Sequence, residues 1–258
     1  MTAPPTPPSA TLSTLAEVRA ALVADTLVPP PAHASLGVGA MGRLRSEMAR
    51  FSGNADHGDR RSAVERAINR LDPAAAGTAA ASLVRARIQA GITDVDLLAR
   101  AVPLEAVARA IGVPAEDLDA VATDVHAVVR AIGRSAAVTA EMDTCAQRLL
   151  DRFATHPDGA VAAVSVLYQT VDATAALVAT LITQQRTGGV RPSALPGTVR
   201  AATATTTIGG VTIETGDQVS LRFTDVSQEF GGGRHECPGR LLAESIAAGI
   251  AEVCAEID

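Results

Sequence analysis

The chain has 258 residues, of which 47% are hydrophobic and 19% are charged, so it can form a sizeable buried core and is not disordered as a whole. The formal net charge is −6 and the sequence has no cluster of basic residues, which argues against nucleic-acid binding. Three cysteines are too few for a disulfide framework, and the first residues lack the basic and apolar segments of a secretory signal, so we expect a cytoplasmic protein.

The chain begins with a stretch rich in proline and threonine, and we expect residues 1–10 to be a disordered tail. No linker divides the remainder, so residues 11–258 are expected to form a single domain. Apolar residues at helical spacing predict helices over most of the chain up to residue 186, several of them ended by proline or glycine. The expected helices span 12–28, 42–51, 60–71, 76–90, 94–101, 103–111, 115–133, 136–155 and 159–186.

The helix expected over 159–186 contains a long apolar stretch, from Gly159 to Ile182, that is long enough to span a bilayer. The middle of this stretch carries four polar residues, Gln169, Thr170, Asp172 and Thr174. Polar side chains at that depth would be costly in contact with lipid. We therefore predict a buried central helix of a soluble domain, with no membrane partner.

Beyond Thr187 the sequence pattern changes from helical to strand-like. Glycines and prolines break the helix, and β-branched residues dominate Thr198–Thr207. The tetrad Ile208-Gly209-Gly210-Val211 is typical of a β-hairpin turn. The remaining expected elements are strands over 211–214 and 218–223, a loop over 225–236 and a last helix over 237–257. The chain is therefore predicted to be mainly α with a small β patch.

The segment with the clearest chemical meaning is the glycine-rich stretch from Phe230 to Ala243. It places Cys237 at the start of the last expected helix, where backbone N–H groups and the helix dipole favour a thiolate over a thiol. The glycines allow the loop backbone to approach a flat ligand. A single thiolate on such a loop suits an iron that is held mainly by a macrocycle. The alternative interpretation is a buried structural cysteine beside a flexible loop.

Phe230, Gly233, His235, Cys237 and Gly239 resemble the cysteine-loop signature of the cytochrome P450 superfamily, Phe-x-x-Gly-x-(His/Arg)-x-Cys-x-Gly. The resemblance implies a reduced P450-like fold around a buried haem b, and these five residues would surround that cofactor. It further implies that Cys237 is the axial ligand of the haem iron and that His235 contacts a haem propionate.

Two other segments resemble haem-anchoring parts of the same family. His57 and Arg61 lie four residues apart on one face of an expected helix, like the family's pair that holds a propionate. Arg200 lies eight residues before Ile208, as does the propionate-binding arginine of bacterial members. Taken singly, the first pair suits an exposed helix start and Arg200 a solvated strand. Together with His235, the resemblance implies cationic or hydrogen-bonding groups for two buried carboxylates.

The central helix departs from the family pattern, which places an acid and a hydroxyl over the haem. One alignment makes Asp172 the acid and puts Ala173 in the place of the hydroxyl, whereas a shift by one residue makes Thr174 the hydroxyl and loses the acid. We expect Asp172 to relay protons, with Thr170 and Thr174 ordering water. A purely structural role for Asp172 stays open.

Three neighbouring residues complete the expected site. Tyr168, Gln169 and Ala173 are predicted to line the substrate pocket, where the phenol and the amide would hydrogen-bond a polar substrate.

The proximal side, which is the cysteine-bearing side of the haem, is expected to be reduced. Between Thr183 and Phe230 the sequence lacks the family's Glu-x-x-Arg helix and its long meander. The tetrad Glu47-Met48-Ala49-Arg50 fits that spacing far upstream and is expected to be an ordinary helix face. The resemblance covers most of residues 50–258. A second copy of the chain or a partner subunit is therefore expected to cover this side.

The resemblance implies a haem-thiolate oxidoreductase of the monooxygenase type, acting on a small organic molecule of secondary metabolism by iron-oxo or peroxide-type oxidation. Two alternatives stay open. One is a redox-neutral haem catalyst for dehydration or for N–O or N–N chemistry, and the other is a non-catalytic haem-binding partner subunit.

Overall fold

The computed structural model describes residues 8–30, 39–52, 54–133, 138–189, 193–224, 226 and 228–256. The α-helices are α1 (Leu15–Val23), α2 (Ala40–Glu47), α3 (Asn54–Asn69), α4 (Pro73–Gln89), α5 (Val95–Ala110), α6 (Leu118–Gly133), α7 (Ala140–Arg152), α8 (Ala160–Thr187) and α9 (Arg240–Cys254). Short 3-10 turns are η2 (Ala49–Phe51), η3 (Ala115–Asp117) and η4 (Gly233–His235). The strands are β1 (Ala10–Leu12), β2 (Leu27–Val28), β3 (Gly197–Ala202), β4 (Thr206–Ile208), β5 (Val211–Ile213) and β6 (Gln218–Arg222).

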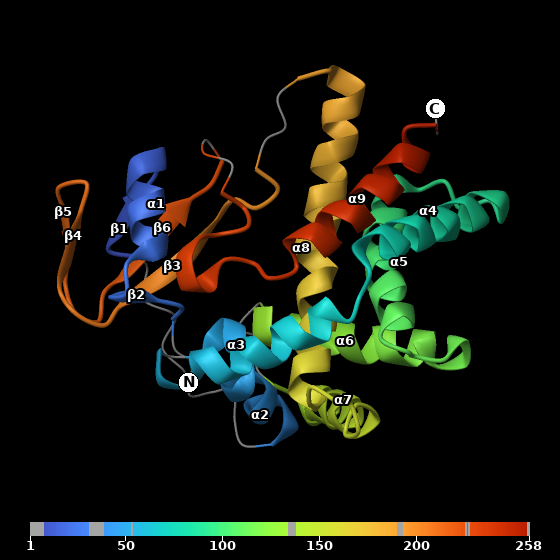
Figure 1. Ribbon diagram of the computed structural model, residues 1–258, viewed down its shortest axis with the longest axis horizontal. Coiled ribbons are helices and arrows are strands. Elements are labelled where there is room, and N and C mark those ends of the chain that lie inside the picture. Colours follow the sequence, from blue (N-terminus) through green and yellow to red (C-terminus); the bar gives the residue numbers. More distant parts are fainter. Residues whose placement is uncertain are drawn as a thin grey trace.

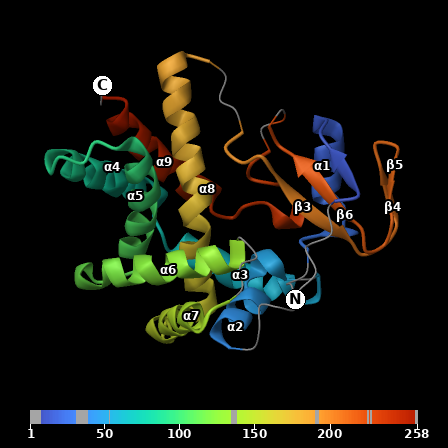
Figure 2. The same ribbon diagram turned by 180° about the vertical axis from the view of Figure 1, so that it is seen from behind.

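The molecule consists of two regions that meet at a cavity. The first, here called the sheet lobe, contains α1, the sheet with strand order β1-β6-β3-β2 and the β4–β5 hairpin. The second, here called the helical body, contains α2 to α9. Figures 1 and 2 show the sheet lobe on one side and the helical body on the other, with α8 running through the body. The prediction of a mainly helical fold with a small β patch is confirmed.

Most helices begin and end within about four residues of the predicted bounds, although α3 begins at Asn54, six residues before its expected start; local capping groups fix several of these ends. The Asp72 side chain accepts hydrogen bonds from the backbone amides of Ala74 and Ala75 at the start of α4, and Pro73 occupies its first turn. The C-terminus of α8 is fixed by Gly188, which follows its last residue and has a left-handed φ of 65°. The β4–β5 hairpin also forms as predicted, with positive φ angles at Gly209 and Gly210.

Two expectations for the helices were wrong. The break expected before Pro103 is absent, because α5 runs from Val95 to Ala110 with Pro103 inside it. A proline costs a helix one hydrogen bond, but Pro103 is buried where α5 packs against α4, α8 and α9. The helix expected over 12–28 is only Leu15–Val23, flanked by β1 and β2.

The short strands β1 and β2 exist only because the late part of the chain pairs with them. Strand β1 runs parallel to β6, and β2 pairs antiparallel with β3. The expected tail therefore extends too far, because the Ser9 amide donates to the Gln218 carbonyl at 2.7 Å and Ala10 starts β1. The outer part of that tail, residues 1–7, lies outside the described residues.

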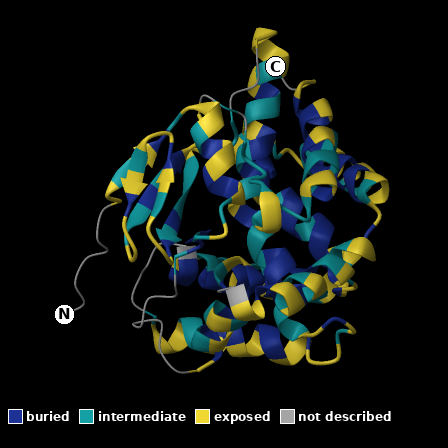
Figure 3. Ribbon diagram, turned by 60° about the vertical axis from the view of Figure 1, so that its left-hand side comes forward, coloured by how far each residue is buried: buried dark blue, intermediate teal, exposed yellow. Residues whose placement is uncertain are grey.

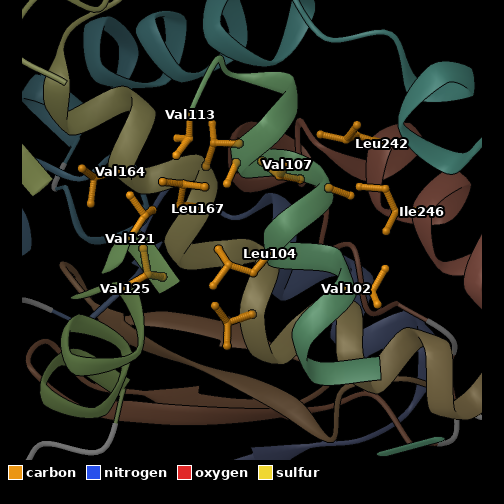
Figure 4. Close-up of a cluster of buried hydrophobic side chains, with 14 of the residues drawn as sticks. Val102, Leu104, Val107, Val113, Val121, Val125, Val164, Leu167, Leu242 and Ile246 are labelled. Atoms are coloured by element: carbon orange, nitrogen blue, oxygen red, sulfur yellow. The ribbon is translucent and has the colours of Figure 1, made fainter. Parts of the chain in front are cut away.

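Each region has its own apolar core. The core of the helical body joins α5, α8 and α9, where Leu104, Leu167 and Ile246 are fully buried (Figure 4). A smaller core lies between α1 and the sheet. Buried residues gather where the helices meet (Figure 3). Helix α8 packs against α3, α5, α6, α7 and α9, and 61% of its most apolar stretch is buried, so the prediction of a buried central helix is confirmed.

Two glycines bring α9 into direct backbone contact with α4. A Cβ atom at Gly77 would lie 2.6 Å from the carbonyl oxygen of Ser245, and one at Gly249 would lie 2.3 Å from the carbonyl oxygen of Gly77. Neither position tolerates a side chain without a backbone shift. This contact fixes α9, and with it the loop that precedes α9 in the chain.

Candidate functional site

A cavity of about 530 Å³ lies between the sheet lobe and the helical body. Its lining includes residues of α1, α2, α3, α5, α8, α9, β3, η2 and the loop that carries Cys237. Segments from both ends of the chain therefore meet around one space. Two parts of the lining are distinguished below, the cysteine-loop wall and the α8 wall.

The cysteine loop, Phe230–Gly239, is held by its own backbone. The Cys237 amide donates to the Phe230 carbonyl at 2.8 Å, which closes the loop into a tight turn around η4. Gly233 does not line the cavity. It has a φ of +60°, and a Cβ there would lie 3.0 Å from the carbonyl oxygen of Leu22, so glycine is needed where α1 packs on the loop.

Cys237 lines the cavity, but it precedes the first residue of α9, Arg240, by three positions. The expected placement within the helix is therefore wrong, although the amide of Gly239, the N-cap residue of α9, still favours a thiolate. Burial raises the pKa of the Cys237 thiol, although the Gly239 amide and the charge of Arg61 act in the opposite direction. Without a cofactor, burial therefore favours the thiol form of Cys237. An additional positive charge beside the sulfur would favour the thiolate.

The structure brings together the four residues that the sequence suggested as anchors, and this group with Phe230, Cys237 and Gly239 is the cysteine-loop wall. The ring centroids of His57 and His235 are 4.2 Å apart in an edge-to-face arrangement. Arg61 donates to the Glu236 carbonyl next to the cysteine. Arg200 extends from β3 and is only 7% exposed, so the expectation of a solvated strand residue does not hold.

Buried polar atoms of this wall have no partner in the described part of the protein. These atoms are Nε of Arg200 and Nε2 of His235. Burial, followed by the charge of Arg50, lowers the pKa of Arg200 to about 10. Burial, followed by His57 and Arg200, lowers the pKa of His235 to about 3. An anion against these residues would supply hydrogen-bond acceptors for such nitrogen atoms.

These residues fit a haem. Its iron would supply the positive charge that a Cys237 thiolate requires, and its two propionates would accept hydrogen bonds from the donors of Arg200 and His235. In the described residues no group of three or more metal-ligating side chains comes together, so one cysteine facing a cavity is compatible with a metal that a macrocycle already holds.

The α8 wall is a single stripe of one helix. Its members follow the spacing of three and four residues that defines a helix face, namely Val166, Gln169, Thr170, Ala173, Thr174 and Leu177. The Thr170 hydroxyl donates to the Val166 carbonyl at 2.8 Å. Thr170 and Thr174 are both buried. Gln169, Thr170, Ala173 and Thr174 therefore lie where a ligand would contact them, as the sequence suggested.

Asp172 does not lie on this stripe. It is exposed and absent from the cavity lining, and its charge acts on His126 and Tyr168 instead. The expectation that Asp172 is buried over the ligand is wrong, because a step of one residue turns a side chain about 100° round the helix axis. Ala173 and Thr174 both line the cavity, so the hydroxyl of Thr174 is available there whereas the acid of Asp172 is not.

Tyr168 also lies outside the cavity lining, contrary to the expectation. Its ring packs edge-to-face on Phe51, with 6.1 Å between the centroids, and burial raises the pKa of its phenol. Tyr168 therefore supports the wall rather than forming it.

The cavity residues that the sequence analysis did not predict include two arginines, Arg45 and Arg50. The tetrad over 47–50 is not one helix face, because Glu47 pairs with exposed Arg43 whereas Arg50 reaches Gln169 at 3.4 Å. One signal was available in the sequence. Arg45 directly follows Leu44, which is buried in α2, and one residue turns the helix by about 100°. The side chain of Arg45 therefore lies beside the buried face and not opposite to it.

No family model matches the chain, and no curated protein matches its sequence. Solved structures do match. CalO2 is 18% identical with a TM-score of 0.72, over 95% of this chain and 82% of that one. P450BioI, in complex with an acyl carrier protein ligated to hexadec-9Z-enoic acid, is 18% identical with a TM-score of 0.69, over 94% and 83% of the two chains. A mutant of the mixed-function P450 MycG, in complex with mycinamicin IV, is 19% identical with a TM-score of 0.68, over 94% and 81%.

The chain therefore has the cytochrome P450 fold, as the sequence resemblance predicted. At these identities the likeness concerns the fold, and the activity has to be argued from the site itself.

Proposed function

We propose that the cavity binds haem b with Cys237 as the axial ligand, and that the protein is a P450-like haem-thiolate oxidoreductase acting on a small organic molecule. One observation carries the proposal. The half-buried thiol of Cys237 lines the same cavity as Arg200 and His235, each of which has a buried nitrogen atom without a hydrogen-bond partner in the described residues. A macrocycle that brings one metal cation and two carboxylates satisfies all three groups at once.

When bound, the haem supplies oxygen- or peroxide-activating chemistry, and the thiolate tunes its iron. The residues of the chain then have separate tasks. His57, Arg61, Arg200 and His235 hold the propionates. On the α8 wall the hydroxyls of Thr170 and Thr174 hold water and its protons near the reacting atoms. This task belongs to the two threonines because Asp172 lies off the wall.

The test is spectroscopic. Protein produced with a haem supply is reduced and treated with carbon monoxide, and the wild type is compared with Cys237→Ala and Cys254→Ala. Cys254 is a buried cysteine outside the cavity lining, so it is the matched control. We expect the thiolate-type Soret band in the wild type and in Cys254→Ala and its loss in Cys237→Ala. Colourless wild-type protein, or a band that survives in Cys237→Ala, would contradict the proposal.

The α8 wall favours a redox-neutral haem catalyst as the second candidate. The cavity-lining residues of α8 offer hydroxyls and an amide but no carboxylate to deliver protons. An aldoxime is a suitable probe, because its dehydration yields a nitrile and water with no net oxidation. Peroxide-driven oxidation of a test substrate supports the oxidoreductase, and anaerobic nitrile formation by the ferrous protein supports the alternative. A thiolate spectrum with neither activity identifies a non-catalytic haem-binding subunit.

The proposal includes a partner on the proximal side, in the reducing cytoplasm where the three thiols stay free. Val23 of α1 contacts the cysteine loop and is 63% exposed, and Leu241 of α9 follows the loop and is 69% exposed. We propose that a second copy or a partner subunit covers them. Light scattering should give the mass of a dimer for the purified wild type and of a monomer for Leu241→Glu. A monomeric wild type would exclude the second copy and leave a different partner subunit as the cover of Val23 and Leu241.

A further inference from the structure

Two guanidinium groups lie around one aromatic ring at the edge of the cavity. The Cζ atom of Arg45 is 3.5 Å from the centroid of the Phe51 ring, and that of Arg50 is 5.8 Å from it. All three residues line the cavity. A guanidinium stacked on a ring keeps its N–H donors free at its edge, where they can bind a planar anion.

Neither arginine is neutralised by the protein. Neighbouring arginines form ion pairs, such as Arg43 with Glu47, but in the described residues no carboxylate pairs with Arg45 or Arg50. The Nε and Nη1 atoms of Arg45 are buried and have no hydrogen-bond partner there. Burial, followed by the charge of Arg50, lowers the pKa of Arg45 to about 10, although Tyr168 raises it. Two like charges held together in a partly buried place indicate an anion site.

The two haem propionates already have their own donors, His57, Arg61, Arg200 and His235. Arg45 and Arg50 come from α2 and η2, and Arg50 hydrogen-bonds Gln169 of the α8 wall rather than any of these four. The charge of Arg50 also acts on Arg200 and Cys237, but the four proposed donors suffice for two propionates, so a further anion at Arg45 and Arg50 would come from the substrate.

We infer that Arg45 and Arg50 bind a carboxylate on the substrate, and that the apolar part of the substrate lies along the α8 wall. The inference rests on the proposed function, because it assigns the haem cavity. Val166, Ala173 and Leu177 supply the apolar surface next to Gln169. The substrate class is thus an amphipathic organic acid with an apolar body.

The experiment is calorimetric titration of the haem-loaded full-length chain with octanoate and with octanamide, its uncharged counterpart. The variants are Arg45→Gln, Arg50→Gln and Arg43→Gln. Arg43 lies on the same helix as Arg45 but outside the cavity lining, so it is the matched control. In the wild type we expect octanoate to bind about tenfold or more tightly than octanamide, the effect of one charge-assisted hydrogen bond. This preference should disappear in Arg45→Gln and Arg50→Gln and stay in Arg43→Gln.

Equal binding of the two probes, no binding of octanoate, or an unchanged preference in both cavity variants would overturn the inference. So would a loss of haem from Arg45→Gln, since Arg45 would then hold a propionate. If Arg45→Gln does not fold, the exposed Arg50 carries the same expectation. Wild-type protein that takes up no haem would overturn the proposed function. Because calorimetry does not depend on iron, the same titrations on the haem-free chain would still test the arginine pair.

Discussion

The cysteine-loop wall and the α8 wall of the cavity differ in charge and in backbone geometry. The first combines a half-buried thiol with imidazoles and arginines, and its members come from α3, β3 and the loop before α9. The second is one uncharged face of one regular helix.

Because of this difference, the residues of the two walls are recognised from the sequence in different ways. On the cysteine-loop wall most positions demand one kind of residue, because a metal ligand or a propionate donor has few substitutes. On the α8 wall the backbone imposes nothing, and only the rotation of the helix decides which side chains face the ligand.

The largest expected effect is a difference in haem affinity between a variant of the cysteine-loop wall and a variant of the α8 wall. Arg200→Gln should weaken haem binding about 10- to 100-fold, because a buried charge-assisted hydrogen bond to a propionate is worth about 1.5–3 kcal/mol. Gln169→Ala, on the α8 wall, should leave haem affinity unchanged. Titration of haem into haem-free protein gives both values, and equal losses for the two variants would contradict the division.

A second prediction concerns the attachment of the cysteine-loop wall to the helical body. Gly249→Ala should lower the free energy of unfolding by about 1–3 kcal/mol, because the new Cβ would meet the backbone oxygen of Gly77, which cannot rotate away. Gly58→Ala on α3 is the control, since a Cβ there has open space. Urea denaturation measures both. An unchanged Gly249→Ala would show that α9 does not need its contact with α4.

The pH dependence of stability is a third and smaller effect. Burial, followed by the charge of Arg61, lowers the pKa of His57 below its ordinary value. Between these two values the unfolded chain binds a proton that the folded chain does not, so haem-free protein should lose stability as the pH falls below about 6.5. The loss from His57 is at most about 1.4 kcal/mol per pH unit. Urea midpoints between pH 7.5 and 5.5 should depend less on pH in His57→Gln than in His156→Gln, and equal slopes would refute the prediction.

The smallest effects are expected on the α8 wall. Thr174→Val should slow turnover about fivefold, the worth of one neutral hydrogen bond, while Asp172→Asn should change it less than about twofold because Asp172 is exposed and off the wall. Turnover is measured as peroxide-driven oxidation, with haem content as the control. A larger loss of turnover in Asp172→Asn than in Thr174→Val would contradict this prediction and would indicate that Asp172 relays protons.

Predictions from the sequence succeeded where a feature depends on a few neighbouring residues. The Gly209-Gly210 hairpin and the end of α8 at Gly188 follow from local patterns, whereas the meeting of His57 with His235 was implied by the family resemblance. They failed where distant segments decide. Strands β1 and β2 need partners about 200 residues further along the chain, and no local pattern reveals such partners.

The sequence by itself therefore determined the helical body, the late hairpin and the identity of the groups around Cys237, because backbone sterics and side-chain chemistry act over a few residues. Only the tertiary structure decided three further points. It placed Thr174 rather than Asp172 at the cavity, it brought Arg45 and Arg50 to the edge of the cavity, and it half-buried Cys237, which raises the pKa of its thiol. Each of these depends on which surfaces lose water when distant segments pack, and burial of that kind is a property of the assembled fold.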